Sequence, residues 1–171
     1  MDWFVADKNY VEYLHNFDYK VGKVDYGDKL KLHVGTILEI NDFKFYVPVS
    51  SPKEKHKHMK NSLDFQKIED NQNNLYAVIN INNMIPIPEQ YITKLKYNEI
   101  EKFRAFHTEK EKTDYIYLLQ KEKAIIDQLA STLQKKAIKL YCKVTQNPDS
   151  TLAKRCCNFE LLQEKATEYH E

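Results

Sequence analysis

The second half of the chain restricts the fold most, because its composition strongly favours helix. Residues 98–146 contain no glycine or proline and are rich in Glu, Lys, Leu and Ile. Apolar residues recur there at helical spacing and mark a stripe that faces a partner surface: Tyr115, Leu118, Leu119, Ile125, Ile126, Leu129 and Leu133. We predict two helices, divided near residues 108–113 where charged residues dominate, and Asn147-Pro148 ends the second.

The first half has the pattern of strands joined by turns. Two apolar runs, residues 30–40 and 43–49, are separated by Asn41-Asp42, which predicts a β-hairpin. Further extended segments are expected at residues 3–6, 64–68, 75–81 and 90–95. Strands that come first and helices that come later predict an α+β fold. Because no shift of composition demands a second domain, residues 1–171 are expected to form one domain.

Composition excludes several functional classes. The 25 acidic and 26 basic residues nearly cancel, so any affinity for nucleic acid must come from a local patch. Three glycines, none in a phosphate-cradling arrangement, argue against an enzyme that uses a nucleotide cofactor, and no cofactor is expected. Three cysteines without a CxxC spacing suggest reduced thiols and no zinc site. Without a secretory signal or a membrane-spanning stretch, we expect a cytoplasmic protein.

The stretch from Val47 to Lys60 gathers hydroxyl and basic side chains in a chain whose net charge is only +1. Ser50 and Ser51 end an apolar run just before Pro52, and a cluster of cations follows: Lys53, Lys55, His56, Lys57, His58 and Lys60. Hydroxyls that bind a phosphate beside ammonium groups that neutralise it suit phosphodiester chemistry. The alternative is an ordinary strand exit followed by a solvated charge run.

Several ordered segments together resemble a known family, the ribonuclease toxins of type III toxin–antitoxin systems (ToxN/AbiQ). The matching residues are Asn9 to Leu14, Phe17-Asp18, Lys20-Val21, Val34-Gly35, Leu38 to Ile40, Tyr46 to Lys53, His56, Met84 to Ile87, Cys157 to Leu162 and Glu164-Lys165. The resemblance spans the whole chain. It is densest up to about residue 90 and again at the end, and the long helical stretch between is similar in character rather than in motif.

The resemblance implies a compact, strongly twisted antiparallel sheet or barrel flanked by helices, similar to the Kid/MazF toxins. It also implies sequence-selective, metal-independent cleavage of cellular or phage mRNA, leaving a 2′,3′-cyclic phosphate and a 5′-hydroxyl. The implied partner is a pseudoknotted RNA antitoxin, cut by the toxin from a repetitive precursor and closed with it into a cyclic protein–RNA assembly. The implied role is abortive infection against phage, with no membrane or DNA partner.

The same resemblance places the catalytic centre at Ser51 and Lys53. Ser51 would donate to a phosphate oxygen or position the 2′-hydroxyl, and Lys53 would neutralise charge that develops on phosphorus. Ser50 is a second donor at a position where many relatives have threonine. Lys31 would approach the same phosphate, the alternative being a solvent-facing strand lysine.

Contacts with RNA are expected from several further residues. Tyr10 and Tyr26 would lie near the scissile nucleotide, although Tyr10 also falls on the apolar stripe of the first helix and could be a core residue. His56 could carry a proton, bind phosphate or lie on a helix surface. Lysines outside the centre are candidates for phosphate contacts: Lys55, Lys57 and Lys60, and less decisively Lys135, Lys136, Lys139 and Lys143.

Two other functional classes remain open on sequence grounds. A non-catalytic RNA-binding module would use the same basic turn and tyrosines but would not require the paired hydroxyls of Ser50 and Ser51. A scaffold protein with a helical tail would need neither. No histidine spacing suggests a metal site, because His56 and His58 would face different sides of a helix.

Overall fold

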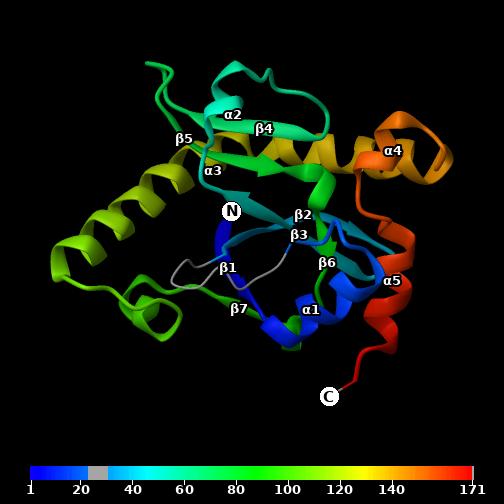
Figure 1. Cartoon of the computed structure of the whole chain (residues 1–171), viewed down its shortest axis with the longest axis horizontal. Coiled ribbons are helices and arrows are strands. Elements are labelled where there is room, and N and C mark those ends of the chain that lie inside the picture. Colours follow the sequence, from blue (N-terminus) through cyan, green and yellow to red (C-terminus); the bar gives the residue numbers. More distant parts are fainter. Residues whose placement is uncertain (23–30, 171) are drawn as a thin grey trace.

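The computed structural model describes residues 1–22 and 31–170 of the 171. Its centre is an antiparallel sheet in the order β4-β5-β3-β2-β1-β7, with the short β6 paired to β3 (Figure 1). The strands are β1 Asp2–Ala6, β2 His33–Ile40, β3 Phe43–Ser50, β4 Phe65–Glu69, β5 Leu75–Asn80, β6 Ile85–Pro86 and β7 Ile92–Lys94. The predicted α+β class is therefore confirmed.

The β2–β3 hairpin is the element that positions the candidate site. Asn41 and Asp42 form its turn with φ values of 50° and 65°, the left-handed conformations that a two-residue hairpin loop requires. Ile40 pairs with Phe43 at the turn and His33 pairs with Pro48 at the open end. Beyond that end the tip of β3 pairs with β5 on one side and keeps a backbone hydrogen bond to Leu32 on the other, so both sides of the strand exit are held.

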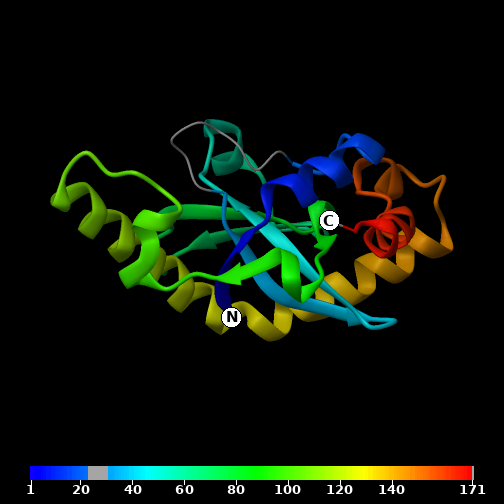
Figure 2. The ribbon, with the colours of Figure 1, turned by 90° about the horizontal axis from the view of Figure 1, so that it is seen from below.

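Helices cover the sheet on both faces. The long helix α3 (Glu109–Gln146) contacts β2, β4 and β5 along one face, while α1 (Lys8–Phe17) lies on the other side of the sheet (Figure 2). The shorter helices are α2 Glu54–His58, α4 Thr151–Arg155 and α5 Phe159–Glu168, and three 3₁₀ turns are η1 Ile81–Asn83, η2 Glu89–Tyr91 and η3 Tyr97–Lys102. Contacts of α5 with α1, α3 and β6 close the end of the sheet near the carboxyl terminus.

The prediction of two helices within residues 98–146 was wrong for the first of them. A short 3₁₀ turn, η3, precedes one helix of 38 residues that begins at Glu109, inside the charged stretch. The Thr108 hydroxyl accepts a hydrogen bond from the Glu111 backbone N–H and caps the helix. A salt bridge between Lys110 and Asp114, one turn apart, further supports this start, so local polar contacts replace the missing apolar spacing.

The cysteines occupy ordinary positions. Cys156 and Cys157 are buried, Cys142 is exposed, and all three are free thiols. Burial is the main cause that raises the pKa of Cys156 to about 12, which keeps its thiol protonated and unreactive. Within the described residues, no helix is both long and apolar enough to cross a membrane, and no cluster of His, Cys, Asp or Glu could hold a metal ion.

Candidate active site

Lys31 and Ser50 meet at the open end of the β2–β3 hairpin. The Val49 backbone N–H donates to the Leu32 carbonyl oxygen over 3.0 Å, which continues the ladder past the last strand pair and sets Lys31 opposite Ser50. The Lys31 ammonium donates a hydrogen bond of 2.7 Å to the Ser50 hydroxyl oxygen. Strand pairing therefore holds the Lys31 ammonium beside the Ser50 hydroxyl. The alternative interpretation of Lys31 as a solvent-facing strand lysine is not supported.

A cavity of about 310 Å³ opens at this point. The four residues predicted as catalytic all line it: Lys31, Ser50, Ser51 and Lys53. Pro52 lies just beyond the end of β3 and turns the chain, so that Ser51 and Lys53 are exposed at the mouth while Ser50 and Lys31 are partly buried. The structure thus brings two hydroxyls and two ammonium groups onto one concave surface, as the sequence predicted.

Burial changes the acidity of Lys31. Removal from water, and then the positive charge of nearby Lys53, lower the pKa of Lys31 to about 8. Its ammonium is therefore a better proton donor near neutral pH than an ordinary lysine. Neighbouring His33 is fully enclosed, and burial followed by the charge of Lys31 lowers its pKa to about 3, so the imidazole stays neutral in the core.

His56 supports the turn from inside. Its side chain is only 6% exposed, packs near the Phe65 ring, and accepts a 3.0 Å hydrogen bond at Nδ1 from the Lys53 backbone N–H. The His56 backbone N–H in turn donates to the Lys53 carbonyl oxygen. The imidazole therefore holds the backbone of Lys53, while a contact of His56 with RNA stays a prediction.

We expect His56→Phe to lower kcat by about 10- to 100-fold, because small displacements of a catalytic group are costly. Phenylalanine keeps the ring against Phe65 but cannot accept from the Lys53 N–H. Steady-state cleavage kinetics together with a thermal melt test this expectation. Unchanged kcat in a folded variant would show that the hydrogen bond does not position Lys53.

Tyr10, one of the two tyrosines predicted to bind RNA, does not line the cavity. Tyr10 is 0% exposed, donates a 2.6 Å hydrogen bond from its hydroxyl to the Pro86 carbonyl oxygen, and stacks on Tyr91 with ring centroids 5.1 Å apart. Apolar periodicity placed it in the core, and the core interpretation is the one that the structure supports. Tyr26 lies outside the described residues.

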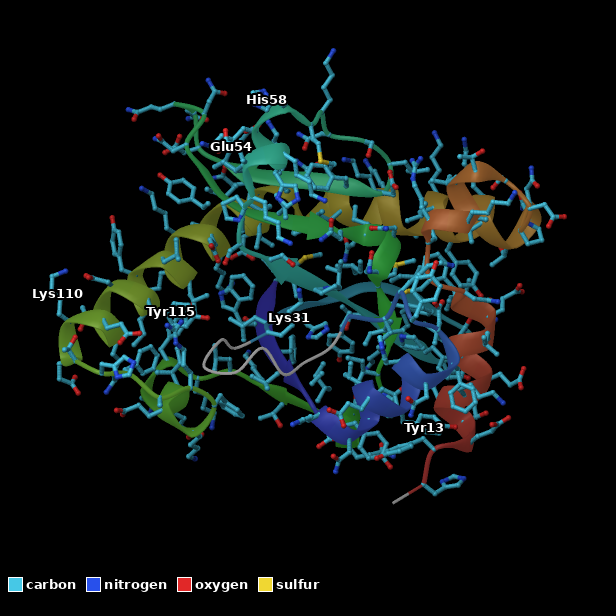
Figure 3. All side chains as sticks on the ribbon, viewed as in Figure 1. Tyr13, Lys31, Glu54, His58, Lys110 and Tyr115 are labelled. Carbon is cyan, nitrogen blue, oxygen red and sulfur yellow. The ribbon has the colours of Figure 1, made fainter. Side chains whose placement is uncertain are left out.

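The remaining basic residues lie on the surface to different degrees. Lys55, Lys57 and Lys60 are exposed along and beyond α2, where Lys57 pairs with Glu54 over 2.7 Å. Figure 3 shows Glu54 and His58 on this outer edge of the molecule, away from Lys31. On α3, Lys136 donates to the Gln66 side-chain oxygen and is partly buried, whereas the others are exposed: Lys135, Lys139 and Lys143.

Comparison with known proteins decides the family. The family described as Toxin ToxN, type III toxin–antitoxin system, matches residues 3–167. This chain belongs to the ToxN family. Its sequence is 29% identical to endoribonuclease AbiQ of Lactococcus lactis subsp. lactis, over 98% of this chain and 88% of AbiQ. Endoribonuclease ToxN of Pectobacterium atrosepticum is also 29% identical, over 99% of this chain and 94% of that protein.

Solved structures agree with this ToxN-family assignment. A toxin studied for its selective inhibition by a non-coding RNA pseudoknot superposes with a TM-score of 0.83, at 27% identity over 98% of this chain and 96% of that chain. AbiQ, a lactococcal anti-phage endoribonuclease of a type III system, superposes with a TM-score of 0.80, at 26% identity over the same shares. The resemblance expected from the sequence is confirmed, and with it the fold.

The cavity of this ToxN-family chain also has a second wall, which the sequence analysis did not assign to the site. That wall comes from the first turns of α3 and from β1, and it consists of Trp3, Tyr115, Leu118, Leu119 and Glu122. Figure 3 shows Tyr115 on the inner side of these turns, facing the region of Lys31. Tyr115, Leu118 and Leu119 belong to the predicted apolar stripe. The sequence therefore predicted which face of the helix is covered, but it did not predict that this face borders the cavity.

Proposed function

We propose that this chain is the endoribonuclease toxin of a type III toxin–antitoxin system and that its active site is the cavity around Ser51 and Lys53. The observation that carries the proposal is the convergence of two hydroxyls and two lysines on one cavity in a member of the ToxN family. Cellular or phage mRNA is the substrate that fits, because cations and hydroxyls of this kind recognise the phosphodiester backbone.

Cleavage needs a 2′-hydroxyl in line with the phosphate and stabilisation of the charge that develops on phosphorus. The 2′-hydroxyl gives its proton to solvent water as its oxygen forms the new bond to phosphorus, and the bond to the 5′-oxygen breaks. Ser51 and Ser50 donate to the phosphate or orient the 2′-hydroxyl, and Lys53 neutralises the pentacoordinate phosphorus. Lys31, with its lowered pKa, gives its proton to the departing 5′-oxygen. The products are a 2′,3′-cyclic phosphate and a 5′-hydroxyl, and no metal ion is required.

This role of Lys31 predicts a pH dependence. The proton that leaves with the 5′-oxygen is present below the lowered pKa and is lost as the pH rises through about 8. We therefore expect kcat to fall above that pH, well below the range in which an ordinary lysine titrates. A pH–rate profile of single-turnover cleavage measures this, with Lys31→Arg as the comparison. A parent profile that stays flat well beyond pH 8 would remove Lys31 from the proton transfer.

The proposed antitoxin is an RNA, as in the related toxin that a pseudoknot inhibits. We propose that this chain cuts a repetitive precursor, remains bound to the pseudoknot product and closes with it into a cyclic assembly. Such a system acts where mRNA is translated, in the cytoplasm, and release of the toxin would abort phage infection. This is tested by expressing the chain together with a plasmid that carries the DNA upstream of its reading frame. The RNA repeats that this DNA encodes should suppress toxicity.

A non-catalytic RNA-binding module is the competing function. It would need the lysines but would not require the partly buried hydrogen bond between Lys31 and Ser50. A purified chain that binds RNA but does not cleave it would support the binding module. Denaturing gels of RNA incubated with the purified chain separate the two functions directly.

A further inference from the structure

The cavity has two chemically different halves. One half, at the strand exit, carries the groups that suit a phosphate: Ser51, Lys53 and Lys31. The other half, on α3, is formed by Tyr115, an apolar wall and a single carboxyl group, that of Glu122. An aromatic and apolar wall beside a phosphate site is the arrangement that receives a nucleobase, and 310 Å³ lies within the size range of small-ligand sites.

Glu122 is unusual for a residue on a helix rich in exposed charges. It is only 6% exposed and lies on the same helix face as Leu118 and Leu119, within the apolar stripe. Among residues 1–22 and 31–170 no group donates a hydrogen bond to its carboxyl or pairs with it. Burial of a polar group is costly, and no contact among the described residues offsets that cost, so the carboxyl that lines the cavity is available to pair with a group of the ligand.

We infer that Glu122 pairs with the edge of the base next to the scissile phosphate and favours adenine and cytosine at that position. This inference rests on the proposed function, since it names the base that the α3 half of the same active site recognises. Tyr115 lies on the same wall, and the base would stack against its ring. The guanidinium carbon of Arg104 lies 4.3 Å from the centroid of the Tyr115 ring, and this contact holds the ring in place.

The protonation state of Glu122 explains the choice of bases. Burial raises its pKa to about 8, so the carboxyl is mostly neutral at pH 7 and offers one O–H donor and one carbonyl acceptor. Adenine and cytosine present an amino donor beside a basic ring nitrogen, which matches this pair. Guanine and uracil present a ring N–H beside a carbonyl oxygen, a weaker acceptor for the carboxyl O–H. The discrimination is therefore graded rather than absolute.

Two substitutions separate base reading from a structural or proton-transfer role. Glu122→Gln keeps the shape, the donor and the acceptor, whereas Glu122→Leu keeps only the volume and removes both. Asp114→Asn, an exposed carboxylate on the same helix, is the matched control. Each protein is given a pool of RNAs with a randomised cut region, fragments are sequenced to find the bases that flank each cut, and thermal melts verify that every variant is folded.

We expect the parent, the control and Glu122→Gln to share a preference for adenine or cytosine beside the cut. Glu122→Leu should lower the ratio of adenine and cytosine sites to guanine and uracil sites by about twofold to tenfold, less than the worth of a whole paired contact, because the carboxyl also pairs, more weakly, with guanine and uracil. An unchanged ratio in Glu122→Leu would overturn the inference. So would an equal loss of cleavage at all four bases in Glu122→Gln, which would assign a proton transfer. A parent that cuts no RNA would overturn the proposed function itself.

Discussion

Alanine in place of Lys53 is expected to lower kcat/KM for RNA cleavage by about 100- to 1000-fold, the usual cost of removing one group that stabilises charge in the transition state. The side chain is exposed at the mouth of the cavity, so its removal leaves no hole in the core and the melting temperature should not change. Affinity for RNA should be mostly retained, because the other lysines predicted to contact phosphates are unchanged. Single-turnover cleavage, a thermal melt and a binding titration measure the three effects.

Ser51→Ala should reduce cleavage in the same way, since it removes the exposed hydroxyl that borders the same cavity. Lys110→Ala provides the control: it deletes another exposed lysine, at the start of α3, without touching the cavity lining. Loss of cleavage in the control, or parent kinetics in both site variants, would contradict the placement of the active site at the exit of β3. The family assignment would be unaffected by either result.

Phe159→Ala is expected to lower the free energy of unfolding by about 3 to 5 kcal/mol, the range for truncating a buried aromatic residue. The Phe159 ring is 1% exposed and stacks on Tyr141 of α3 with centroids 5.8 Å apart. It also meets Phe45 of the sheet edge-on at 6.1 Å, and so ties α5 to both layers. Since a domain of this kind is stable by only about 5 to 15 kcal/mol, this single change removes a large share of its stability.

Urea denaturation followed by far-UV circular dichroism gives the free energy. Tyr117→Ala is the matched control, because this tyrosine is 64% exposed on α3 and its removal should change the free energy by less than about 0.5 kcal/mol. A loss of under 1 kcal/mol in Phe159→Ala would mean that α5 is not anchored through this ring. Cleavage by the fraction of Phe159→Ala that remains folded should be unchanged, because the ring lies outside the cavity.

Local sequence predicted the parts of the site that lie close together in the chain. Asn41-Asp42 fixed the hairpin, and the short distance from Ser50 to Lys53 made that turn visible as a cluster of hydroxyls and cations. The family resemblance placed Lys31 beside them, and the register of the antiparallel hairpin, set by its two-residue turn, is what brings Lys31 there in the structure.

The second wall of the cavity could not be derived in this way. Tyr115 and Glu122 lie more than 60 residues after the turn, and nothing in helical periodicity says which part of the sheet the stripe of α3 will cover. A signal was nevertheless present: Glu122 interrupts the apolar face one turn after Leu118. The same kind of ambiguity affected Tyr10, since an apolar stripe does not distinguish a core tyrosine from one that lines a site.

The most direct test of the central claim is cleavage of a mixed-sequence RNA in excess EDTA, with the parent and Lys53→Ala side by side. The account predicts discrete fragments that end in a 2′,3′-cyclic phosphate from the parent, and nearly intact RNA from the variant. EDTA removes divalent metals, so these fragments would also establish that the reaction needs none. Intact RNA from the parent, retarded on a native gel, would contradict the claim and establish a binding module.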